Sequence, residues 1–169
     1  MTTDSATTNP SAGRRAFDVL CGKWTGHHRK IRDNTDPDCT EWVEFEAEHV
    51  TSLVLEGGGQ LDVLTAADGQ PVPAFEALTL RLYDPEADTW SIYWLSSRAP
   101  GGVIDPPVVG VARATGCTFE CDDVVGGRPV RSASSGTGPI PLPVYRQDFA
   151  APGTSDWVTN WESVFTRRD

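Results

Sequence analysis

Long apolar runs and clusters of basic residues are both missing from this sequence of 169 residues. No apolar run approaches the roughly 18 residues of a membrane-spanning helix, so we expect no such helix. Acidic residues outnumber basic residues by 24 to 14, which gives a net charge of −10. Because nucleic-acid backbones and anionic membrane surfaces are bound by clustered lysine and arginine, we expect neither as a partner.

Several sequence signatures of catalysis and metal binding are missing as well. The chain has no P-loop, no dinucleotide-binding fingerprint and no nucleophile elbow. Its three histidines include no His-x-His pair, and its four cysteines include no Cys-x-x-Cys pair. In an extended strand, Cys117 and Cys121 would lie roughly 13 Å apart, at about 3.3 Å per residue, which is too far for a disulfide or a shared ion. We therefore expect four free thiols, no metal site and no cofactor.

The start of the chain is rich in threonine, serine and alanine and lacks the apolar core of a secretory signal. We expect residues 1–12 to be a disordered tail and residues 13–169 to form a single domain. A cytoplasmic location follows as an expectation, since cysteines stay reduced there. Between Ser11 and Cys21 the apolar residues recur at nearly helical spacing, which predicts a short N-terminal helix that Gly22 ends.

The rest of the sequence predicts about ten short strands separated by turns. The pattern is clearest between Cys39 and Thr51, where three glutamates alternate with apolar residues, as expected for a sheet with one wet face. Ten sequential strands favour an all-β, antiparallel up-and-down barrel, because closure removes the exposed sheet edges. The prolines in the stretch Ser135 to Pro143 exclude a central strand there.

Several runs of residues between Phe17 and Arg167 carry a resemblance to known proteins: Gly22 to Lys30, Leu82-Tyr83-Asp84-Pro85, Trp90-Ser91-Ile92-Tyr93-Trp94, Asp105 to Gly110 and Trp157 to Trp161. The chain resembles the calycin superfamily of lipocalins, fatty-acid-binding proteins and nitrobindin, and more narrowly a bacterial calycin-like family of unknown function, DUF1579. The resemblance implies a lipocalin-like barrel with Trp24 in its floor, packed against Arg167 or Arg168. The segment Arg131 to Pro143 departs from the family pattern.

Strand parity identifies His28 as the first candidate for acid–base chemistry. If Trp24 points into the barrel, Gly26 and His28 do so too, and His27 faces outward. Gly26 would leave space beside the imidazole. A histidine in such a cavity can act as a general acid or base near neutral pH. Alternatively, His28 is a structural histidine bonded to a neighbouring strand.

Two further residues are candidates for catalysis, and five for ligand binding. Glu41 shares a face with Val43 and Phe45, where apolar surroundings would raise its pKa, unless it lies at the rim. Tyr93 is the second, although parity does not say which face of its strand lines the cavity. Four tryptophans could stack on a flat ligand, and two of them, Trp157 and Trp161, form a row with Thr159 on one face of their strand. Arg81 could anchor a ligand carboxylate if it does not face solvent. These five candidates are Trp90, Trp94, Trp157, Trp161 and Arg81.

The expected function is binding of a small hydrophobic or aromatic molecule in the barrel. The protein would be a carrier or a cofactor-free isomerase or cyclase, in which the barrel excludes water and supplies one acid–base group. The alternative is a haem protein like nitrobindin, although no histidine follows His49 to provide the late iron ligand of that family. A homodimer is left open.

Overall fold

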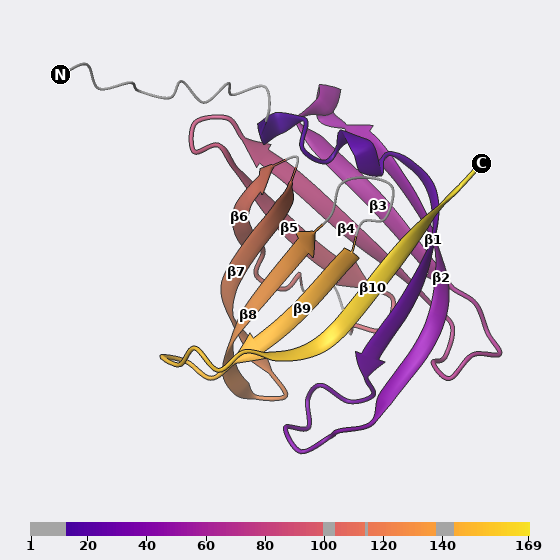
Figure 1. Cartoon of the computed structure of the whole chain (residues 1–169), viewed down its shortest axis with the longest axis vertical. Helices are drawn as coiled ribbons and strands as arrows, with labels where there is room; N and C mark the ends of the chain where they lie inside the picture. Colours follow the sequence, from indigo (N-terminus) through magenta and orange to yellow (C-terminus); the bar gives the residue numbers. More distant parts are fainter. Residues whose placement is uncertain (1–12, 100–103, 114, 138–143) are drawn as a thin grey trace.

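The fold is a closed antiparallel β-barrel, seen in a computed structural model that describes residues 13–99, 104–113, 115–137 and 144–169. Ten strands follow one another around the barrel in chain order, and β10 pairs with β1 to close it (Figure 1). The strands are β1 Gly22–Ile31, β2 Trp42–Val54, β3 Gly59–Ala66, β4 Phe75–Asp84, β5 Thr89–Ser96, β6 Val108–Arg113, β7 Gly116–Val125, β8 Arg128–Thr137, β9 Val144–Ala150 and β10 Val158–Arg168. The predicted all-β, ten-strand barrel is therefore confirmed, and it is compatible with a calycin-like fold.

The predicted helix over residues 11–21 is not observed. Among the described residues of this stretch, the structure has a 3-10 turn, η1, at Asp18–Leu20. Several amides of this stretch bond to carbonyls three residues earlier, as in Leu20 N–H to Phe17 O at 2.9 Å. A second 3-10 turn, η2 at Leu55–Gly57, joins β2 to β3.

Side chains from the barrel hold this N-terminal turn by its backbone carbonyls. Gln60 Nε2 donates to Phe17 O at 2.6 Å, and Trp24 Nε1 donates to Leu20 O at 2.7 Å. Arg167 donates to Cys21 O at 3.2 Å. The carbonyls are thus fixed by long-range partners, and the turn lies across the end of the barrel where β1 begins (Figure 1).

Trp24 forms the floor of the barrel, as the resemblance implied. Its side chain is 2% exposed, and the Arg167 guanidinium lies 5.1 Å from its ring centre. Arg168 points away and pairs with Glu48 on the outer surface. Of the two arginines that the sequence offered, Arg167 is therefore the floor partner.

Most strands bury alternate residues, but β3 and β4 reverse the usual distribution of polarity. Gln60 and Asp62 are buried toward the interior, whereas the residues that alternate with them are apolar and face outward. An apolar hollow on this outer face is lined by Leu61, Leu78, Leu80, Leu82, Tyr93, Leu95 and Ile104. Parity in these strands therefore places polar side chains inside the barrel.

The segment that departed from the family pattern is regular in the part that the structure describes. β8 continues to Thr137, and its register against β7 and β9 is unbroken. The three prolines of the Ser135 to Pro143 stretch lie outside the described residues, and so do the residues of the expected N-terminal tail. All four cysteines are free thiols.

Candidate functional site

The barrel encloses a cavity of about 1110 Å³. That volume is at or above the upper end of ordinary ligand pockets, about 300–1,000 Å³. The aromatic part of its lining includes Trp94, Trp161 and Phe165, and the polar part includes His28, His49, Thr51, Asp62, Arg81, Tyr145 and Ser163. The cavity therefore combines flat apolar walls with a set of buried polar groups.

Five of the polar groups form one chain of hydrogen bonds across four neighbouring strands. At one end, the Asp62 carboxylate on β3 accepts two bonds from β2. Thr51 Oγ1 donates to Asp62 Oδ1 at 2.7 Å, and His49 Nδ1 lies 2.9 Å from Asp62 Oδ2. Both carboxylate oxygens are thus engaged by side chains of the barrel wall.

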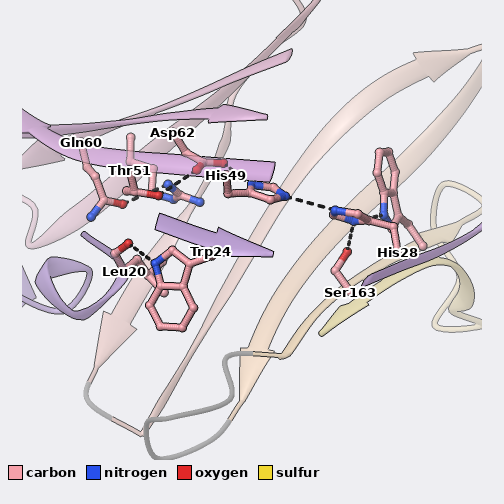
Figure 2. Close-up of polar contacts among 10 residues, drawn as sticks. Leu20, Trp24, His28, His49, Thr51, Gln60, Asp62 and Ser163 are labelled. Atoms are coloured by element: carbon pink, nitrogen blue, oxygen red, sulfur yellow. Dashed lines mark hydrogen bonds and ion pairs between the residues drawn. The ribbon is translucent and has the colours of Figure 1, made fainter. Parts of the chain in front are cut away.

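The chain continues from β2 to β1 and then to β10. His49 Nε2 lies 3.1 Å from His28 Nε2, and His28 Nδ1 lies 2.7 Å from Ser163 Oγ. Figure 2 shows this order from Asp62 through the two imidazoles to Ser163. Trp161 Nε1 also donates to His28 Nδ1, at 3.3 Å. Both ring nitrogens of each buried histidine are therefore occupied.

One assignment of protons satisfies every group in the chain. An indole N–H can only donate, so the bond from Trp161 makes His28 Nδ1 an acceptor. Neutral His28 then carries its proton on Nε2 and donates it to His49 Nε2. His49 in turn carries its proton on Nδ1 and donates to Asp62, which accepts as a carboxylate. The hydrogen bonds thus run in a single direction, from Ser163 to Asp62.

Gly26 makes the contact between the two imidazoles possible. A Cβ atom at this position would lie 2.5 Å from His28 Nε2 and 2.8 Å from His49 Nε2, closer than real carbon contacts. A side chain at position 26 would therefore displace an imidazole. The expectation of open space beside His28 is wrong, because His49 fills that space.

The pKa values of the chain fit this assignment. Burial, with the nearby charge of protonatable His49 adding to it, lowers the pKa of His28 from 6.5 to about 3, so the imidazole is neutral at neutral pH. Burial alone would raise the pKa of Asp62, but the hydrogen bond and charge of His49, with help from Arg81 and Thr51, bring it below the ordinary value. Asp62 is therefore a carboxylate.

A separate polar group, Arg81, enters the cavity from β4. Its Nη1 donates to Gln60 Oε1 at 2.9 Å, and Gln60 is fully buried. The guanidinium also lies 5.3 Å from the ring centre of Phe17. Burial lowers the pKa of Arg81 and raises that of Tyr145, which lines the same cavity.

The structure brings together four of the residues that the sequence singled out. His28, Arg81, Trp94 and Trp161 all line the cavity. The parity prediction for strand 1 is confirmed: His28 is 2% exposed, whereas His27 faces outward and lies 3.5 Å from Glu44.

The other four candidates lie outside the cavity lining. Glu41 is exposed at the rim and pairs with Arg32 at 2.8 Å. Tyr93 faces the outer hollow, because β5 turns the opposite face inward. Trp90 is core, donating from Nε1 to Gly13 O at 3.0 Å.

Trp157 does not share a face with Trp161, although the sequence predicted that both lie in one row with Thr159. The register between β9 and β10 shifts between Thr159 and Trp161, so the two tryptophans do not share a face. Trp161 points inward, while Trp157 packs under the Arg131 guanidinium at 4.9 Å.

Of the five residues in the hydrogen-bond chain, the sequence analysis identified only His28, although the positions of two others could have been predicted. His49 and Thr51 continue the alternation of Val43, Phe45 and Ala47, so parity alone placed them inside. The inward direction of Asp62 could not be predicted, because its neighbours Leu61 and Val63 are apolar and would be expected to face inward instead. Ser163 gave no signal of its own.

Comparisons with known proteins identify no family for this chain. No protein-family model matches the chain, and the comparison with curated proteins gave no match. Within the described ranges, no group of three or more His, Cys, Asp and Glu side chains could hold a metal ion. The same residues include no helix that is long and apolar enough to cross a membrane.

Proposed function

We propose that the barrel binds a small apolar or aromatic molecule and converts it by proton transfer, as a cofactor-free isomerase or cyclase. The observation that supports this is the buried chain of hydrogen bonds in the wall of a large, aromatic-lined cavity. A cavity of this kind holds a flat molecule in one conformation and excludes water from it.

In this proposal the hydrogen-bond chain from Ser163 to Asp62 is a proton relay, and Ser163 is the end that contacts the bound molecule. A bound molecule donates a proton to Ser163 Oγ, and the hydroxyl passes its own proton to His28 Nδ1. His28 releases the proton on Nε2 to His49 Nε2. His49 becomes an imidazolium beside the Asp62 carboxylate, and the ligand keeps the electron pair. Return of the proton to another ligand atom completes an isomerisation.

The two histidines have different roles in this scheme. His28 holds an added proton poorly, because its pKa is about 3. It therefore conducts the proton, whereas His49 stores it, since the Asp62 carboxylate lies 2.9 Å away. The acid–base role that the sequence analysis expected for His28 alone is therefore shared by His28 and His49 in this proposal.

The finer family and location assignments remain part of the proposal. The closed barrel is compatible with the calycin-like fold that we propose. The DUF1579-like identity and the cytoplasmic location rest on the sequence alone. The haem alternative has no support in the site, because both ring nitrogens of His28 and of His49 are bonded to protein groups.

Binding in the cavity is tested with N-phenyl-1-naphthylamine, a neutral aromatic probe whose fluorescence rises in apolar surroundings. Thr79 lines the cavity, and its neighbour Leu80 lines the outer hollow. We expect Thr79→Phe to weaken binding at least about tenfold, because it fills the cavity. Leu80→Phe should leave binding unchanged. No binding, or a larger effect of Leu80→Phe, would contradict the proposal.

Conversion is tested with the molecule that co-purifies with the protein from its host, identified by native mass spectrometry. We expect His28→Ala to lower turnover by at least about a hundredfold, within the range of general acid–base catalysis. His27→Ala is the matched control, since that side chain faces solvent. Binding without turnover in the wild type would make the protein a carrier.

A further inference from the structure

Arg81 is a partly buried cation that forms no ion pair with a carboxylate of the described residues. None of the ion pairs among those residues includes it. The carboxylate whose charge acts on Arg81, Asp62, has both oxygens bonded to Thr51 and His49. Burial of an unpaired charge is costly, and proteins normally compensate it with a counter-ion. A guanidinium at a cavity wall that forms no ion pair can therefore take an anionic partner from the cavity.

The wall around Arg81 positions the cation without neutralising it. Gln60 accepts one N–H through Oε1, and its own amide is fixed by donation to Phe17 O. A guanidinium has five N–H donors, and the described residues accept only one of them. Because Arg81 lines the cavity, the remaining donors are available to a molecule inside it.

We propose that Arg81 is an anion anchor, and that the molecule bound in the barrel carries one oxyanion, such as a carboxylate, on an apolar or aromatic body. The inference rests on the proposed function, because it uses the same cavity. The anion would take the guanidinium donors, and the aromatic body would contact Trp94 and Trp161. The ligand class thus narrows to small aromatic or apolar acids.

Two fluorescent probes with the same skeleton isolate the anion. 8-Anilino-1-naphthalenesulfonate carries a sulfonate, and N-phenyl-1-naphthylamine is the same molecule without it. In Arg81→Met, we expect the affinity for the sulfonate probe to fall about ten- to a hundredfold, the range of a charge-assisted hydrogen bond. The affinity for the neutral probe should stay within about twofold.

Two further variants separate the anchor from a structural effect. Arg81→Lys keeps the charge and should recover part of the sulfonate affinity. Arg29→Met removes an equal charge from the outer face, where Arg29 bonds to Glu162, and should change neither affinity. Circular dichroism of each variant verifies that the barrel is folded.

The outcomes distinguish this inference from the proposed function. If Arg81→Met weakens both probes equally, or neither, the anion anchor is wrong while cavity binding stands. If neither probe binds the wild type, the proposed function fails and the anchor with it. Selective loss of the sulfonate probe, with rescue by lysine, supports the anchor.

Discussion

His28 is the residue on which proton uptake by the folded protein depends most clearly. Its pKa is lowered from 6.5 to about 3 because the imidazole is buried, with the neighbouring histidines adding to the effect. Below about pH 6.5 the unfolded chain therefore binds one proton at this position that the folded chain does not. Since the unfolded state then carries more protons, the free energy of unfolding falls as the pH is lowered.

The expected slope is about 1.4 kcal/mol per pH unit from this one group, between the two pKa values. Urea unfolding of the wild type and of His28→Phe, measured from pH 6 to pH 4.5, gives the difference in slope. The variant loses stability at every pH, because Ser163 and His49 lose a partner, but its curve should be flatter. Parallel curves would show that His28 titrates normally in the folded protein.

At the scale of single residues, parity predicted positions well and partners poorly. The inward direction of His28 followed from Trp24, which lies four residues earlier on the same face of the strand. Its partner His49 could not be deduced, since the contact depends on the register between β1 and β2, where Trp24 lies opposite His49. Register is a property of two strands, and one strand's sequence does not contain it.

Among the elements, the N-terminal turn shows how tertiary contacts override local propensity. The spacing of apolar residues from Ala12 to Leu20 is close to helical, and it predicted a helix. Long-range donors such as Gln60 and Arg167 instead hold individual carbonyls of the turn. These donors lie on β3 and β10, far from the turn in the sequence, so the sequence of the turn alone could not reveal its conformation.

The contact of this turn with Trp24 predicts a large effect of one substitution. Trp24→Ala removes a side chain that is 2% exposed, together with the bond to Leu20 O and the contact with Arg167. We expect a loss of about 3–5 kcal/mol in the free energy of unfolding, as for other large-to-small core changes. Equilibrium denaturation measures it. Trp157→Ala, at a half-exposed position, is the control, and a loss under about 1 kcal/mol for Trp24→Ala would show that Trp24 is not core.

In β10, one shift of register made the prediction about Trp157 wrong. Trp157, Thr159 and Trp161 were expected to share one face because they are two residues apart. The register shift between Thr159 and Trp161 adds a residue on one side of the ladder and separates them. Sequence patterns assume an unbroken pleat, so a bulge changes every assignment beyond it.

For the whole molecule, strand number and closure could be predicted, and the content of the interior could not. Ten sequential strands with short turns leave antiparallel neighbours as the simplest arrangement, and the observed order follows it. The interior was less accessible, because β3 and β4 place polar residues inside and leucines outside. Hydrophobic patterning indicates the opposite, and it fails where a cavity replaces a packed core.

The pairing of β1 with β10 closes the barrel, so that every strand has a neighbour on both sides. Lys23 lies opposite Arg168, so the beginning and the end of the barrel are adjacent. A linker that joins the end of β10 to residue 13, ahead of the N-terminal turn, would leave every pair of neighbouring strands intact. The chain could then be opened at another turn, such as Asp84–Thr89 between β4 and β5, without changing the cavity. The fold is therefore suited to circular permutation, which would place new chain ends beside a chosen part of the wall.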